Sequence, residues 1–116
     1  MTPALIHHLV DTTAMVFGIT PDQVRSASRE RACVLARNIV ADIAYNEYLF
    51  TFAAIGKEIN RHHSTIIINL ESFRHDCKAK PQLRYLRRQV FNNAQEYLQT
   101  AEGSYITDTL QLPTAE

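Results

Sequence analysis

Five consecutive polar or basic side chains, at positions 61–65, are the part of this sequence best suited to binding a ligand. Their guanidinium, imidazole and hydroxyl groups can hydrogen-bond to the edges of DNA bases or to phosphates, and a threonine methyl group can touch the methyl group of thymine. We therefore expect this run to contact DNA. The candidate residues are Arg61, His62, His63, Ser64 and Thr65.

The residues around this run predict a helix-turn-helix at about 51–77. Thr51 can cap a short helix, and Asn60 suits the tight turn after it because asparagine tolerates the left-handed backbone conformation. The longer helix that follows would present its polar first turn, which is the part that enters the major groove. Its N-terminal N–H groups and dipole also favour phosphate. Apolar residues continue this second helix at helical spacing: Ile66, Leu70, Phe73 and Cys77.

The remaining segments also show helical periodicity, which predicts an all-α domain of about six helices over residues 1–103. Gly18 ends the first helix, and Thr20 followed by Pro21 is a strong start for the second. A third helix is expected from about Arg31 to Tyr45, and Pro81 opens the last. The final residues, 104–116, are expected to form a tail that is either loose or packed as an extended segment.

The composition fits one compact domain of 116 residues, because 46% hydrophobic and 21% charged residues exclude a disordered chain. No apolar run approaches the ~20 residues that a bilayer span needs. The N-terminus places His7 and His8 where a signal peptide would have basic residues and then an apolar core. We therefore expect a cytoplasmic protein without membrane partners, and expect Cys33 and Cys77 to be reduced thiols in apolar surroundings.

The charge balance is neutral, with 12 Lys and Arg against 12 Asp and Glu, whereas nucleic-acid binders are usually basic. The basic residues are nevertheless concentrated in two stretches. A neutral chain with a basic face remains compatible with DNA binding and predicts modest non-specific affinity. The first stretch contains Arg25, Arg29, Arg31 and Arg37. The second follows the first turns of the proposed recognition helix and contains Arg74, Lys78, Lys80, Arg84, Arg87 and Arg88. In this stretch, Arg84, Arg87 and Arg88 are expected to form an ordinary polar face rather than a second DNA contact.

The order of residues from Ile55 to Ile66 resembles the signature of the DNA-binding domain of the DnaA family, the bacterial chromosome replication initiators. That signature reads Ile-Gly, a few residues, Gly, then Arg-Asp-His-Ser/Thr-Thr-Val. Here Ile55-Gly56 is followed by three residues and then Asn60-Arg61-His62-His63-Ser64-Thr65-Ile66. Upstream, Ala36-Arg37-Asn38-Ile39-Val40 is similar to the family's Ala/Pro-Arg-Gln-Ile/Met-Ala helix, and Gly18 to Arg31 parallels the segment before it. The resemblance covers roughly residues 4–76.

This resemblance implies a Trp-repressor-like helical fold and DNA binding through the predicted turn. It implies that His63 and Ser64 contact bases in the major groove and that Thr65 contacts a base or the adjacent backbone. His62 stands where the family has an acidic residue that helps to read bases, so the sequence preference is expected to differ.

The resemblance also assigns basic residues before the helix-turn-helix to DNA. Arg29 would enter the neighbouring minor groove with Arg31 beside it, and Arg37 and Asn38 would hold the phosphate backbone. Arg61 would support the helix start and the phosphates. The alternatives are a solvated loop for Arg29 and Arg31, and for Arg37 a salt bridge to Glu30 or Asp42.

The sequence also departs from the family at two further points: the turn is shorter than the common Gly-Gly version, and Leu35 replaces an arginine of some members.

Other function classes find little support. No Gly-x-x-x-x-Gly-Lys-Ser/Thr loop occurs, so neither nucleotide binding nor ATPase activity is expected. No nucleophile sits beside a histidine in a plausible motif, so we expect no enzyme. A metal site is not expected either, because the best set does not have a recognised zinc spacing. That set is His62, His63, His75 and Cys77.

We therefore predict sequence-preferring binding of double-stranded DNA by a freestanding DnaA-type helix-turn-helix, in replication or transcription control, without a cofactor. The alternative is a protein–protein interaction module derived from such a domain, which the neutral charge favours. A homodimer is left open, with the last helix as one candidate surface: Leu83, Leu86, Val90 and Phe91.

Overall fold

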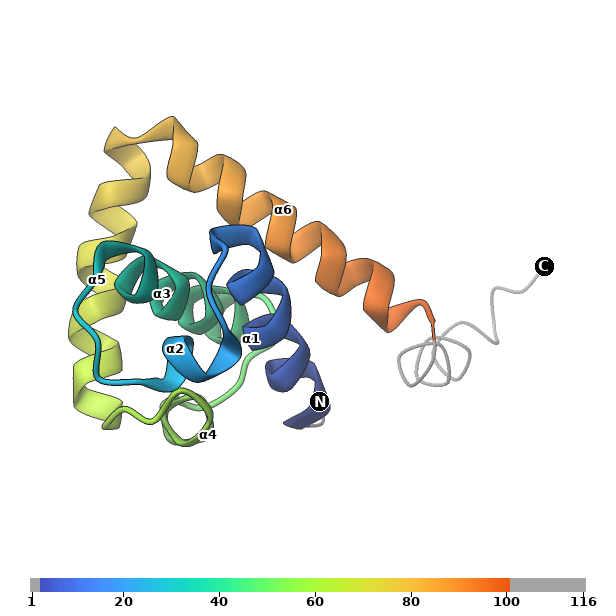
Figure 1. Cartoon of the computed structure of the whole chain (residues 1–116), viewed down its shortest axis with the longest axis horizontal. Helices are drawn as coiled ribbons and strands as arrows, with labels where there is room; N and C mark the ends of the chain where they lie inside the picture. Colours follow the sequence, from blue (N-terminus) through green and yellow to red (C-terminus); the bar gives the residue numbers. More distant parts are fainter. Residues whose placement is uncertain (1–2, 101–116) are drawn as a thin grey trace.

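The computed structural model describes residues 3–100 and contains six α-helices in that range, which confirms the expected all-α class (Figure 1). The expected tail at 104–116 lies outside the described residues. The helices are α1 (Pro3–Phe17), α2 (Pro21–Arg25), α3 (Arg31–Asn46), α4 (Phe52–Ile59), α5 (His63–Ala79) and α6 (Pro81–Leu98).

Local signals set several of the helix ends. Gly18 follows α1 with a φ of 70°, a left-handed conformation that glycine adopts without steric cost. Thr20 caps α2: its Oγ1 accepts from the Gln23 N–H at 3.1 Å, and its own N–H donates to Gln23 Oε1 at 2.8 Å. Thr51 caps α4 in the same way through the Ala54 N–H at 3.1 Å. Each bond satisfies a helix-terminal group that would otherwise lack a partner.

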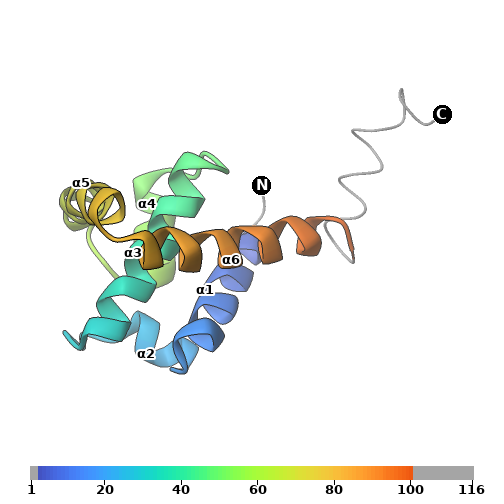
Figure 2. The same cartoon turned by 90° about the horizontal axis from the view of Figure 1, so that it is seen from above.

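Helix α3 is the centre of the domain, because it packs against each of the other five helices. The views in Figures 1 and 2 show α1, α2, α4 and α5 around it, with α6 running along one side. The α3 stripe that carries the core is fully or almost fully buried: Cys33, Ala36, Ile39, Val40, Ala41, Ile43 and Ala44. Burial of this apolar surface is the main stabilising contribution to the fold.

Helix α6 extends along α1 as well as α5. The ring of His8 on α1 stacks on Tyr97 with centroids 4.2 Å apart, and His8 Nε2 lies 2.7 Å from Asn93 Oδ1. Cys33 is buried and Cys77 is half-buried, and both thiols are free. None of the described helices has the length and apolar character needed to span a bilayer.

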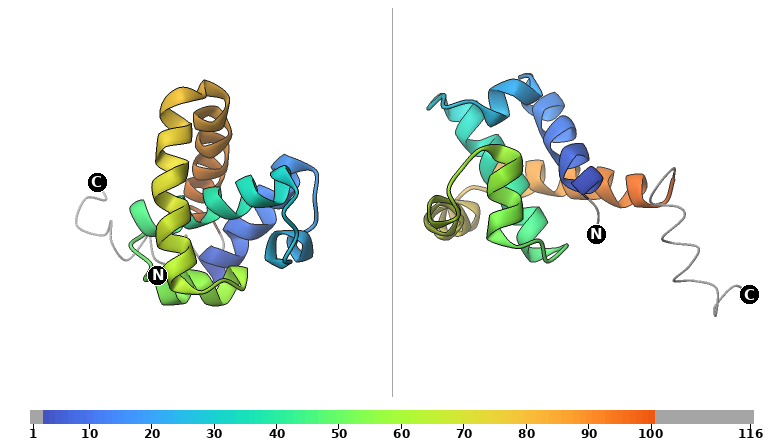
Figure 3. Two further views of the ribbon diagram at one scale, coloured as in Figure 1. Left: turned by 90° about the vertical axis from the view of Figure 1, so that its left-hand side faces the viewer. Right: turned by 90° about the horizontal axis from the view of Figure 1, so that it is seen from below.

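The fold leaves one end of α5 beside the loop that joins α2 to α3. Figure 3 (left) shows α5 along the outside of the molecule, with α4 below its first turn and the α2–α3 loop to one side. Three segments distant in sequence therefore meet at the start of α5.

Candidate nucleic-acid interface

The first turn of α5 presents its polar side chains to solvent. His62, His63 and Ser64 are exposed and Thr65 is half-buried, whereas the next residue, Ile66, is only 2% exposed and anchors the helix in the core. The rings of His62 and His63 lie against each other with centroids 4.3 Å apart. The side chains expected to read bases are thus available to a ligand.

His62 also caps α5, and this fixes its hydrogen-bonding character. Its Nδ1 accepts from the Ser64 N–H at 3.2 Å and lies 2.8 Å from Ser64 Oγ. Because Nδ1 acts as an acceptor, the single proton of the neutral ring is on Nε2. His62 therefore offers a donor at its free edge, where a carboxylate at the same position would offer only acceptors.

The turn between α4 and α5 depends on Asn60 and Gly56. Asn60 has φ 59° and ψ 51°, as its left-handed turn requires. The Arg61 N–H then donates to the Gly56 carbonyl at 2.9 Å. A Cβ at position 56 would lie 2.2 Å from the Arg61 carbonyl oxygen. The glycine of the Ile-Gly pair is thus explained by close backbone packing at this turn.

Arg61 ties this turn to the α2–α3 loop. Its Nη2 donates to the Ser26 carbonyl at 2.6 Å and its Nη1 to the Asn60 carbonyl at 2.8 Å. These bonds hold the turn that precedes α5, and one of them spans 35 positions of sequence.

Arg37 is buried, with 7% of its surface exposed, which differs from the exposed phosphate ligand expected from the sequence. Its guanidinium donates to one carbonyl of α2 and two of the loop: Nη1 to Val24 at 3.1 Å and to Ser26 at 2.9 Å, and Nη2 to Ser28 at 2.5 Å. The alternative salt bridges are also absent in the described part of the chain, since Arg37 pairs with neither Glu30 nor Asp42. These contacts give Arg37 the task of holding the α2–α3 loop.

The electrostatics of Arg37 agree with this structural task. Burial, followed by repulsion from the nearby Arg61 guanidinium, lowers the pKa of Arg37 below its usual value. The shared carbonyl of Ser26, which accepts from both arginines, helps to hold the two cations together.

Hydroxyl groups order the same loop from within. Ser26 Oγ donates to the Gln23 carbonyl at 2.7 Å and accepts from the Ser28 N–H at 3.2 Å, and Ser28 Oγ accepts from the Glu30 N–H at 3.1 Å. Arg29 and Arg31 are exposed at its end, and within residues 3–100 neither forms an ion pair. The structure therefore presents two unpaired cations on an anchored segment.

A polar hollow of about 420 Å³ joins the loop, α3 and the start of α5. It brings together five of the residues singled out from the sequence, while Arg31, Ser64 and the two exposed histidines lie outside its lining. Its lining residues are Ala27, Ser28, Arg29, Val34, Arg37, Asn38, Arg61, Thr65 and Asn69.

The sequence reasoning missed Asn69, Ile67 and Ile68. Asn69 lies four positions after Thr65, a spacing that places both on one helix face and could have indicated it. Ile67 and Ile68 are 44% and 68% exposed although isoleucine is usually buried. They follow His63 and Ser64 by one turn, and such apolar groups can contact thymine methyl groups.

Comparisons with known proteins agree with this geometry. The family model described as bacterial dnaA protein helix-turn-helix matches residues 6–72. The chain is 34% identical over 76 residues to a chromosomal replication initiator protein DnaA of Oleidesulfovibrio alaskensis, a match that covers 66% of this chain and 16% of that protein. It is 28% identical over 64 residues to a chromosomal replication initiator protein DnaA 1 of Chlamydia trachomatis, covering 55% and 14% of the two chains. The matched part thus spans about one sixth of each relative's length.

Proposed function

Because the chain belongs to the bacterial DnaA helix-turn-helix family, we propose that it binds double-stranded DNA with a preference for particular sequences. A helix-turn-helix of this kind is a DNA-binding unit. The observation that carries the proposal is the exposed first turn of α5, set beside the unpaired Arg29 on a loop that two arginines anchor.

The first turn of α5 would enter the major groove. His63 and Ser64 would hydrogen-bond to base edges, and the exposed Ile68 one turn later would contact a thymine methyl group. His62, with its donor at Nε2, would favour an acceptor such as a guanine O6 or N7, whereas a carboxylate would favour the amino group of cytosine. We therefore expect a base preference at this position that differs from the family's.

The α2–α3 loop would lie along the adjoining backbone and minor groove. Arg29 is exposed at its end and would enter a narrow minor groove, with Arg31 near the phosphates. Asn38 and Thr65, which line the polar hollow, would contact a phosphate there. Arg37 and Arg61 would act by holding the loop and the turn in place.

The role in the cell that fits best is replication or transcription control by a DnaA-type domain, without catalysis by this domain. The rival function is a protein-interaction module, which the zero net charge and the exposed Ile67 and Ile68 favour. Salt separates the two, because a DNA complex with about six phosphate contacts should have a log–log slope near −5. The affinity of an apolar protein–protein interface would change little with salt concentration.

Selection from random duplexes at low salt tests the proposal. We expect an enriched motif, with His63→Ala and Ser64→Ala each weakening binding to it by about 1–3 kcal/mol and relaxing its specificity. Lys80→Ala is the matched control, because Lys80 is exposed at the opposite end of α5 and should leave the motif unchanged. Absence of any enriched motif would remove the claim of sequence-preferring binding.

A further inference from the structure

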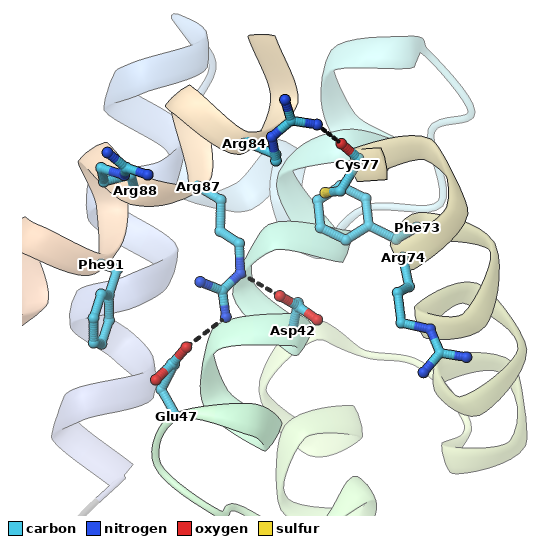
Figure 4. Close-up of a pocket in the computed structure, with 9 residues that line it drawn as sticks. All are labelled: Asp42, Glu47, Phe73, Arg74, Cys77, Arg84, Arg87, Arg88 and Phe91. Atoms are coloured by element: carbon cyan, nitrogen blue, oxygen red, sulfur yellow. Dashed lines mark hydrogen bonds and ion pairs between the residues drawn. The ribbon is translucent and has the colours of Figure 1, made fainter. Parts of the chain in front are cut away.

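A second hollow, of about 360 Å³, opens between α3, α5 and α6, and the proposed DNA contacts do not use it (Figure 4). Its residues Phe73 and Cys77 come 10 and 14 positions after His63 on α5. At 1.5 Å per residue, this places the hollow roughly 15–21 Å along α5 from the DNA-reading turn. The lining consists of Asp42, Glu47, Phe73, Arg74, Cys77, Arg84, Arg87, Arg88 and Phe91.

The floor of this hollow is apolar. Phe73 is 1% exposed, and Cys77 and Phe91 are half-buried and pack against the core. Burial, and then the charge of Asp42, raises the pKa of the Cys77 thiol, which is consistent with a neutral and sparsely hydrated floor. A volume of this size fits one or two apolar side chains of a ligand.

Both acidic groups in the hollow are paired with the same cation, Arg87. Arg87 hydrogen-bonds through Nε to the Asp42 carboxylate, and its Nη2 lies 3.0 Å from Glu47 Oε2. Arg84 donates to the carbonyls of Cys77 and Lys78 at the end of α5, so it serves as a helix cap.

Two cations remain unpaired on opposite sides of the floor. Arg74 on α5 and Arg88 on α6 are exposed, and neither has an ion pair or hydrogen bond among residues 3–100. Figure 4 shows Arg74 and Arg88 at opposite margins, with Phe73 and Cys77 between them. An apolar floor between two free guanidinium groups is complementary to an apolar side chain flanked by carboxylates.

We propose that this hollow docks an acidic peptide segment of a partner protein, with a leucine or phenylalanine on the floor and carboxylates paired to Arg74 and Arg88. A phosphate backbone fits less well, because it would leave the apolar floor unused. Since the hollow and the DNA-reading turn lie at different ends of α5, the domain can hold a duplex and a partner peptide together.

Titration of ¹⁵N-labelled full chain with a capped hexapeptide, Glu-Asp-Phe-Leu-Glu-Asp, tests this inference by amide chemical shifts. We expect saturable shifts around Phe73, Cys77 and Phe91, and little change at His63. A peptide with lysine in place of each acidic residue should produce no saturable shifts. The affinity should fall as salt rises, because the flanking contacts are between opposite charges.

The double variant Arg74→Glu with Arg88→Glu reverses both charges and should weaken peptide binding at least tenfold. The double variant Arg74→Gln with Arg88→Gln only removes the charges and should weaken peptide binding less. All four substitutions are at exposed, unpaired positions, so unfolding should match the parent. The control is Arg31→Glu with Lys57→Glu, which changes the net charge by the same amount at residues outside the lining of the hollow. It should leave the affinity for the peptide within twofold of the parent.

Four results would overturn the proposal: equal shifts with the lysine peptide, insensitivity to the reversal at Arg74 and Arg88, the same shifts on adding a short duplex, or the same shifts on concentrating the protein alone. The last two would assign the hollow to DNA or to a second copy of the chain. None of them bears on duplex selection by α5, so the two proposals fail independently.

Discussion

Replacement of Arg37 with methionine separates the two tasks that an arginine at this position could have. Methionine keeps much of the aliphatic volume of the arginine side chain but removes its guanidinium N–H donors. If Arg37 holds the α2–α3 loop, the variant loses the bonds to the carbonyls of Val24, Ser26 and Ser28. If Arg37 instead binds phosphate, its replacement should leave the free energy of unfolding of the DNA-free protein almost unchanged.

The expected loss follows from the surroundings of the three carbonyls. A hydrogen bond to a charged donor contributes about 1.5–3 kcal/mol. The bond to Val24 is buried, so water cannot replace it, whereas Ser26 keeps its bond from Arg61 and Ser28 is partly accessible to water. Removal of a desolvated charge offsets part of the loss, as the lowered pKa of Arg37 indicates. We expect the free energy of unfolding to fall by about 2–4 kcal/mol.

Urea denaturation followed by circular dichroism measures this loss, and binding to a selected duplex at several salt concentrations measures the effect on DNA. Arg29→Met is the matched control, because Arg29 is exposed and unpaired. It should change stability by less than about 0.5 kcal/mol while weakening DNA binding. Amide exchange in the loop at 26–30 should accelerate in the Arg37 variant only.

The opposite pattern would refute this reasoning. If Arg37→Met unfolds within about 0.5 kcal/mol of the parent and lowers the salt slope by about 0.9, the loss of one phosphate contact explains it better. Arg37 would then leave the loop carbonyls when DNA binds.

Three further predictions concern the fold around the site. Gly56→Ala should destabilise the domain by about 1–3 kcal/mol in urea, because its Cβ would meet the Arg61 carbonyl oxygen at 2.2 Å; unchanged stability would contradict the close packing. Leu49→Gly should raise stability by up to about 1 kcal/mol, because Leu49 is 82% exposed at a φ of 61°, and a lower melting temperature would contradict this. Burial, and then Glu47, raises the pKa of Tyr48 above its usual 10.0, so its contribution to stability should be complete below about pH 10 and lost at higher pH. Tyr48→Phe should flatten this alkaline decline in unfolding measured from pH 8 to pH 11.5, and an equal decline would contradict the assignment.

Several helix boundaries could be predicted because their signals are local. Thr20 with Pro21, Thr51, Asn60 and Pro81 each act on backbone groups within about four residues. The helical periodicity of the apolar residues likewise predicted the all-α class, which the structure confirms. The polar run after Asn60 predicted the exposed first turn of α5, because polar and charged side chains at a helix start are usually in contact with solvent.

The tasks of individual charged residues could not be predicted in this way. The sequence shows that Arg29 and Arg37 are both cations eight positions apart, but only the packed structure exposes one and buries the other. Likewise, Arg87 was grouped with a polar face, yet it forms ion pairs with Asp42 and Glu47.

The sequence by itself therefore determined the helices, the turn and the family, since these follow from conformational preferences and spacing within a few residues. Only the tertiary structure decided that Arg61 reaches Ser26 across 35 positions, and that Arg74 and Arg88 on different helices flank one apolar hollow. The physical reason is that burial and pairing depend on which distant segments pack together, and the same guanidinium group can hold a loop, neutralise a carboxylate or face solvent.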